Sequence, residues 1–67
     1  MAENRDKWTE IARRYRSYML LEKHLSRNTI ESYMRDLEYF AHFILRYHDV
    51  PPRKVERNMV EHYMVVL

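Results

Sequence analysis

Seven polar residues between Lys23 and Arg35 carry the side chains that proteins use to hold a nucleic acid backbone. Cations attract phosphate groups, while hydroxyl and amide groups form hydrogen bonds with phosphate oxygens and base edges. Arg27 and Arg35 are eight residues apart, which on one helix places them roughly two turns apart along one surface. One interpretation is therefore a surface that contacts duplex DNA through Lys23, Ser26, Arg27, Asn28, Thr29, Ser32 and Arg35.

The same segment also allows a role without DNA. Glu31 precedes Arg35 by four residues, and such a pair on a helix forms an exposed ion pair without any partner molecule. Ser26 and Thr29 are explained by the capping of a helix start. The residue pattern alone leaves a solvated charged face and a DNA-binding face both open. The chain has a second group of basic residues at Arg13, Arg14 and Arg16. On a helix these side chains point in different directions, which favours a solvated surface.

The chain offers no catalytic or metal-binding set. It has no cysteine and no glycine, which excludes a thiolate site and a glycine-rich phosphate loop. Its paired carboxylates, such as Glu31 and Asp36, do not share a helix face, so we expect no acid and base couple. No two of the four histidines are spaced four residues apart, so we expect no metal ion, cofactor or small-molecule substrate at His24, His42, His48 or His62.

A long helix from Arg27 to about Tyr47 must position the DNA-binding candidates. Ser26 is the predicted N-cap, because its hydroxyl can accept from the amide of Asn28 or Thr29. Leu25 before the cap and Ile30 at the fourth helical position form the pair of a hydrophobic staple. Apolar residues then recur every three or four positions and predict one buried stripe at Tyr33, Met34, Leu37, Phe40, Ala41 and Ile44.

Two further helices flank this one. The first is predicted from Asp6 or Lys7 to Glu22, with Trp8, Ile11, Ala12, Tyr15, Tyr18 and Met19 on its inner face. The two prolines, Pro51 and Pro52, lie in a predicted loop from Asp49 to Lys54. The last helix is predicted from Glu56 or Arg57, with Met59, Val60, Tyr63, Met64 and Leu67 facing inward. Among the tyrosines, the core is predicted to contain Tyr15, Tyr18, Tyr33 and Tyr63, while Tyr39 and Tyr47 are partly exposed.

The sequence from Leu21 to Leu37, followed by Phe40 and the Phe43-Ile44 pair, resembles the N-terminal core-binding domain of tyrosine recombinases. Xer and phage integrase proteins are the nearest in pattern, and the similarity extends from about Tyr15 to Leu67. His24 departs from the family's usual Gly or Asn, at a junction that suits a left-handed residue. The resemblance implies a SAM-like helical bundle that lays the helix after Ser26 against DNA and contacts neighbouring protomers in a tetrameric synapse.

The bulk composition is consistent with one small all-α domain over residues 1–67, packed as an orthogonal helical bundle. The net charge is only +2, so a basic surface requires segregation of charge. No apolar run approaches the roughly 20 residues of a membrane span, and the first residues lack the apolar region of a signal peptide. We therefore expect a cytoplasmic protein with no membrane partner.

Four consecutive apolar residues, Met64 to Leu67, cannot all face a core made by two other helices. Exposed apolar patches of this kind favour association. One expectation is that the domain is truncated here: the resemblance implies four helices, of which three are present, followed by a catalytic domain with an Arg, His, Arg and Tyr site that is absent. The tyrosines of this chain would then not include the nucleophile. The alternative is a helical protein interaction module that uses this apolar end to dock a partner helix.

Overall fold

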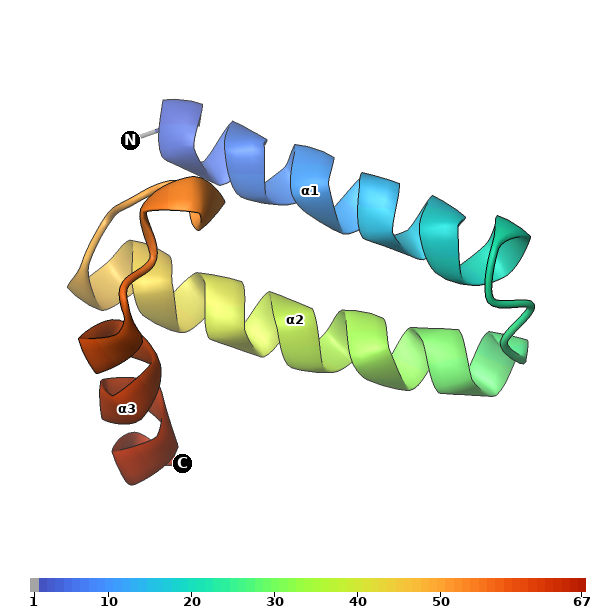
Figure 1. Cartoon of the computed structure of the whole chain (residues 1–67). Helices are drawn as coiled ribbons and strands as arrows, with labels where there is room; N and C mark the ends of the chain where they lie inside the picture. Colours follow the sequence, from blue (N-terminus) through green and yellow to red (C-terminus); the bar gives the residue numbers. More distant parts are fainter. Residues whose placement is uncertain (1) are drawn as a thin grey trace.

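The computed structural model describes residues 2–67, which form three α-helices and one short 3-10 helix. Helix α1 spans Ala2–Leu21, α2 spans Arg27–Tyr47, η1 spans Pro52–Lys54 and α3 spans Arg57–Val66. Helices α1 and α2 run side by side in opposite directions, and α3 lies across the end of this hairpin where α2 finishes (Figure 1). The described residues contain no strand, so the all-α prediction is confirmed.

The start of α2 matches its prediction. Ser26 has an extended backbone, with φ −66° and ψ 156°, and its hydroxyl accepts a hydrogen bond from the Thr29 amide at 3.2 Å. The Ile30 amide donates to the Ser26 carbonyl at 3.0 Å. Ile30 itself is 1% exposed and Leu25 is half-buried, as a staple at the helix entry requires. Local side-chain chemistry therefore sets the first residue of α2.

Replacing Ser26 with alanine should lower the free energy of unfolding by about 1 kcal/mol, because the Thr29 amide loses its acceptor. Chemical denaturation followed by circular dichroism measures this change. Ser26→Asp is the matched control, since aspartate also caps helices and should recover most of the loss. Equal stability of the alanine and wild-type proteins would show that the cap contributes nothing.

The turn between α1 and α2 contains a left-handed residue. His24 has φ 53°, as its position in the sequence predicted. Before it, the amides of Glu22 and Lys23 both donate to the Tyr18 carbonyl, at 2.9 and 3.4 Å, and after it the Leu25 amide donates to the Met19 carbonyl at 3.3 Å. These bonds satisfy carbonyls that the end of α1 would leave unpaired, so the chain reverses within a few residues.

The other end of the hairpin is closed by two side chains of α1. The Asn4 amide donates to the Asp49 carbonyl at 2.9 Å and to the Asp49 carboxylate at 3.2 Å. The Trp8 indole donates to the Val50 carbonyl at 2.9 Å. The Asn4 hydrogen bond also helps to hold the pKa of Asp49 below its usual value, because it favours the ionised carboxylate. Asp49 itself is left-handed, with φ 50°. Together these contacts attach the loop after α2 to α1.

Helix α1 begins at Ala2, several residues before the predicted start at Asp6 or Lys7. The early start has a tertiary cause, because Asn4 lies on the added turn and anchors it to Asp49. Glu3 in the first turn also suits the positive end of the helix dipole. The other helix bounds agree with the predictions to within a residue or two, apart from the short 3-10 turn inside the predicted loop.

The core is small and lies mainly between α1 and α2. Trp8, Ala41, Phe43 and Ile44 form one buried cluster, with Leu37, Phe40 and Tyr63 among the residues packed around it. Met19 and Ile30 are buried nearer the turn. Each buried aliphatic side chain contributes roughly 1.5–3 kcal/mol, so a core of so few residues leaves little excess stability.

Three tyrosines assigned to the core from the sequence are instead exposed. Tyr15, Tyr18 and Tyr33 retain 45%, 44% and 49% of their accessible surface. The reason is that the backbone of α3 lies close to α2 and not to α1, so α3 leaves much of the hairpin face uncovered. Tyr63 is half-buried as expected, and Tyr39 and Tyr47 are exposed.

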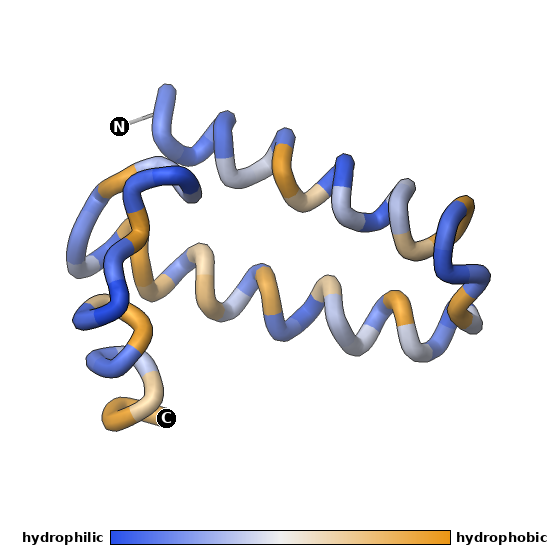
Figure 2. The backbone as a smooth tube through the Cα atoms, in the orientation of Figure 1, coloured by the Kyte–Doolittle hydropathy of each residue, from blue (hydrophilic) through white to orange (hydrophobic). Residues whose placement is uncertain are grey.

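Helix α3 packs through only one side. Met59 and Tyr63 are half-buried, and the Tyr63 ring lies 5.0 Å from Phe40 and 5.1 Å from Phe43 between centroids. The prediction that Val60, Met64 and Leu67 face inward was wrong, because all three are exposed. Figure 2 shows the resulting hydrophobic segment at the free end of α3.

Candidate nucleic-acid interface

The predicted DNA-binding residues gather at the turn end of the hairpin, away from α3 (Figure 1). Six of the seven are exposed, and Thr29 is half-buried. Lys23 belongs to the turn, Ser26 is the cap of α2, and the remaining five lie in its first three turns. The structure therefore brings all seven candidates to one region of the surface.

The first turn of α2 has free hydrogen-bond donors. Ser26 is engaged with Thr29, since its hydroxyl accepts from the Thr29 amide and donates to the Thr29 hydroxyl at 2.9 Å. Within the described residues, the amides of Arg27 and Asn28 donate to no protein group. Free amides at the positive end of a helix attract anions such as phosphate. The capping role of Ser26 and Thr29 is thus accounted for, and the two amides beside them remain open to a ligand.

Three of the candidates share the outer face of α2. Asn28 and Arg35 are seven residues apart, which separates their directions by only about 20°, and Ser32 lies about 40° from Asn28. This face is opposite the buried stripe that contains Leu37 and Ile44. Arg27 lies about 80° from Arg35, at the edge of the same face. The arrangement can present one charged and two hydrogen-bonding side chains to a groove, with a second cation at its border.

The cations of this region are not neutralised by carboxylates. Glu31 and Arg35 form no ion pair with each other anywhere in the described structure. Exposed ion pairs spaced four residues apart occur elsewhere, at Glu10–Arg14, Glu38–His42 and Arg57–Glu61. The exposed Arg35 guanidinium is therefore free to meet a phosphate.

Lys23 points toward α1. Its ammonium lies 5.8 Å from the centroid of the Tyr18 ring, within the range of a cation–π contact. This contact is exposed and costs little to break, because such pairs are worth only about 0.5–1 kcal/mol at the surface. Lys23 therefore borders the region from the side of α1, while Arg27 borders it from α2.

Sequence reasoning missed the continuation of the outer face toward the end of α2. Tyr39, His42 and Arg46 follow Arg35 by four, seven and eleven residues, and these spacings keep them within about 40° of its direction. All three are exposed. The signal was present in the spacing, since Arg35, His42 and Arg46 repeat at helical intervals.

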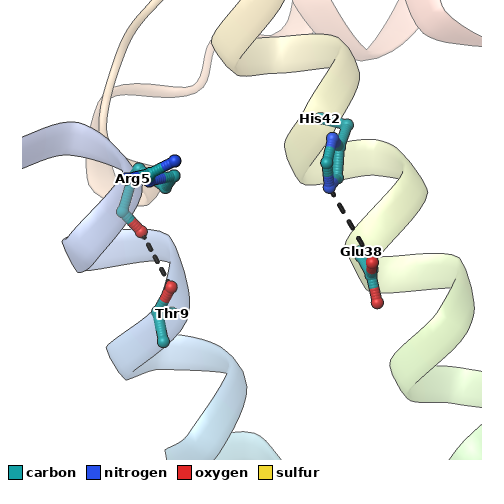
Figure 3. Close-up of polar contacts among 4 residues, drawn as sticks. All are labelled: Arg5, Thr9, Glu38 and His42. Carbon is teal, nitrogen blue, oxygen red and sulfur yellow. Dashed lines mark hydrogen bonds and ion pairs between the residues drawn. The ribbon is translucent and has the colours of Figure 1, made fainter. Parts of the chain in front are cut away.

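A groove lies between α1 and α2 beside this face. It has a volume of about 620 Å³, with Trp8 and Leu37 among its apolar lining residues. Figure 3 shows the polar side chains at its rim, where Thr9 donates to the Arg5 carbonyl at 3.1 Å and His42 pairs with Glu38 at 3.8 Å. Both contacts run along a single helix, and neither bridges the groove. The rim offers no nucleophile activated by a base.

The described residues contain no group of three or more side chains suited to hold a metal ion. They do contain a pair that the spacing of the histidines did not predict, because His48 and His62 meet at the junction of α2 and α3. No helix in the described part of the chain is long and apolar enough to cross a membrane.

A comparison with known protein families finds a match. The family described as "Phage integrase, N-terminal SAM-like domain" matches residues 12–67. No curated protein and no solved structure matches the chain. The matched region contains the whole of the candidate interface, all of α2 and the second half of α1.

Proposed function

Because this chain belongs to the N-terminal SAM-like domain family of phage integrases, we propose that it is the DNA-binding, non-catalytic part of a site-specific tyrosine recombinase. In this role it positions the enzyme on its recombination site in cytoplasmic DNA during integration or recombination. The observation that carries the proposal is the group of unpaired cations and free helix amides at the start of α2.

The contacts divide by chemistry. Lys23, Arg27 and the free amides at the start of α2 suit phosphate oxygens, since they offer charge and donors without sequence preference. Asn28, Ser32 and Arg35 share the outer face of α2 and suit base edges in a major groove, where amide and guanidinium groups read donor and acceptor patterns. Helix α2 is therefore the main DNA-contacting element, and it continues to Arg46 on the same face.

The exposed side of the hairpin supports a further part of this proposal. Tyr15, Tyr18 and Tyr33 are exposed on the hairpin, and Val60 and Met64 are exposed on α3. A fourth helix of the parent recombinase would cover apolar surface of this kind, and neighbouring protomers would contact the domain in the assembled synapse. Catalysis belongs to a separate domain of that parent protein.

A titration with DNA tests the proposal. We expect the amide chemical shifts of Lys23 to Arg35 to change when a short duplex is added at low salt. Because few phosphates are within reach, binding should be weak, and the shifts should fade at several-fold higher salt as counterions compete. Shifts that are absent from this segment, or that survive high salt unchanged, would contradict the proposed interface.

The second candidate function is a protein interaction module. It is favoured by the exposed apolar end of α3, where Val65 and Leu67 retain 84% and 78% of their accessible surface. A partner helix could bury this end against its own apolar face. This function predicts line broadening at Tyr63 to Leu67 as the protein concentration rises, with no effect of DNA on Lys23 to Arg35.

A further inference from the structure

Two histidines from different elements meet at the junction of α2 and α3. His48 Nε2 lies 3.2 Å from His62 Nδ1, and the two rings are nearly perpendicular, with centroids 5.4 Å apart. His48 caps the end of α2, and His62 lies in the middle of α3. At this distance one ring donates a hydrogen bond to the other, so each presents one nitrogen to the same small volume.

The separation of these nitrogens also suits a shared metal ion. Zinc binds imidazole nitrogen at about 2.0–2.1 Å, so two adjacent ligands of one ion lie roughly 2.9–3.4 Å apart. We propose that His48 and His62 form a two-ligand site for a divalent transition metal ion of the imidazole-binding class, such as Zn²⁺, Ni²⁺ or Cu²⁺. Small ring rotations direct both lone pairs at the ion, and the ring that donated the hydrogen bond moves its proton to its other nitrogen.

The surroundings fix the rings on one side and leave the other side open. The Phe43 ring lies 4.8 Å from His62 and 6.0 Å from His48 between centroids, and Tyr47 lies 5.9 Å from His62. His62 is exposed and His48 is half-buried. No third histidine, cysteine or carboxylate of the described chain joins them, so water would supply the remaining ligands of a bound ion.

A metal ion at this site would tie α3 to α2. Helix α3 has no fully buried residue, and its contacts with α2 depend on the same aromatic and histidine rings. An ion that binds only the docked arrangement stabilises it by mass action.

The test is a titration of the protein with ZnCl₂. Two measurements monitor it: the ¹⁵N chemical shifts of the histidine side chains and the midpoint of thermal unfolding. We expect the His48 and His62 rings to shift together at one-to-one stoichiometry, and the unfolding midpoint to rise and then return with a chelator. Removal of even an outer partner of a metal site costs about tenfold or more in affinity, so His62→Ala and His48→Gln should each lose at least that much.

His42→Ala is the matched control, because it removes another exposed histidine, one that pairs with Glu38 on its own helix. It should bind Zn²⁺ as the wild type does. His48→Gln keeps a side chain that can form hydrogen bonds, so it is less disruptive than alanine at this position. Circular dichroism without metal would detect any variant that has unfolded. Equal binding by His62→Ala and the wild type, or equal shifts at His24 and His42, would overturn the proposed site.

Discussion

Replacing Trp8 with alanine is expected to unfold the domain. Trp8 is 5% exposed, lies at the centre of the buried cluster, and makes an edge contact with Phe40 at 5.9 Å between centroids. Truncation of a buried tryptophan costs about 3–5 kcal/mol, and a core in a domain of this size supplies only about that much in total. The mutation also leaves the Val50 carbonyl without its indole donor.

Far-UV circular dichroism over a thermal ramp measures this effect. The alanine variant should show little helix and no cooperative transition at room temperature. Trp8→Phe is the milder variant, because it keeps one ring in the core while it removes the bond to Val50 and part of the indole volume. It should fold and lose about 1–2 kcal/mol. Arg16→Ala is a surface control with an expected change within about 0.5 kcal/mol. A cooperative transition at the wild-type temperature in the Trp8→Ala protein would show that the cluster is not the core.

Reversing the charge of both Arg27 and Arg35 is expected to abolish most DNA binding without changing the fold. Both side chains are exposed and unpaired by carboxylates in the described structure, so their replacement removes no internal contact. Each lost phosphate contact should lower the slope of log affinity against log salt by about 0.9. With repulsion added, Arg27→Glu combined with Arg35→Glu should lose about tenfold or more in affinity at low salt.

The chain offers a control with an identical change in net charge. Arg13 and Arg16 are exposed on α1 and have no carboxylate partner in the described residues. Fluorescence anisotropy with a labelled duplex, measured over a salt series, compares the two double variants. The Arg13 and Arg16 variant should retain most of its binding, because only its long-range field has changed. Equal losses in both variants would mean that overall charge, and not the face of α2, governs binding, and would favour the interaction module.

Features set by local chemistry were predictable from the sequence. The Ser26 cap, the extent of α2 and the left-handed His24 all depend on residues within one or two turns of each other. Such short-range preferences hold whatever the rest of the chain does. The location of the candidate interface can be predicted for the same reason, since it lies on the turn and helix start that these residues define.

Features set by contacts between distant residues were not predictable. The spacing of Tyr15, Tyr18 and Tyr33 indicates which side of a helix is apolar, yet it cannot say whether another helix covers that side. Likewise, Asn4 extends α1 through a contact 45 residues away, and His48 meets His62 only because α3 folds back on α2. The spacing of histidines along the chain carried no sign of that pair.

The hydrogen bond from Trp8 to Val50 also makes tryptophan fluorescence a probe of unfolding in this protein. The chain has a single tryptophan, and its indole lies where α1 closes over the loop after α2. Its emission therefore reports that closure most directly, whereas far-UV circular dichroism reports on all the helices, including α3, whose backbone does not approach that of α1. Where both signals change at one temperature, the hairpin and α3 unfold as a single unit; where ellipticity falls first, α3 has separated while the hairpin remains closed.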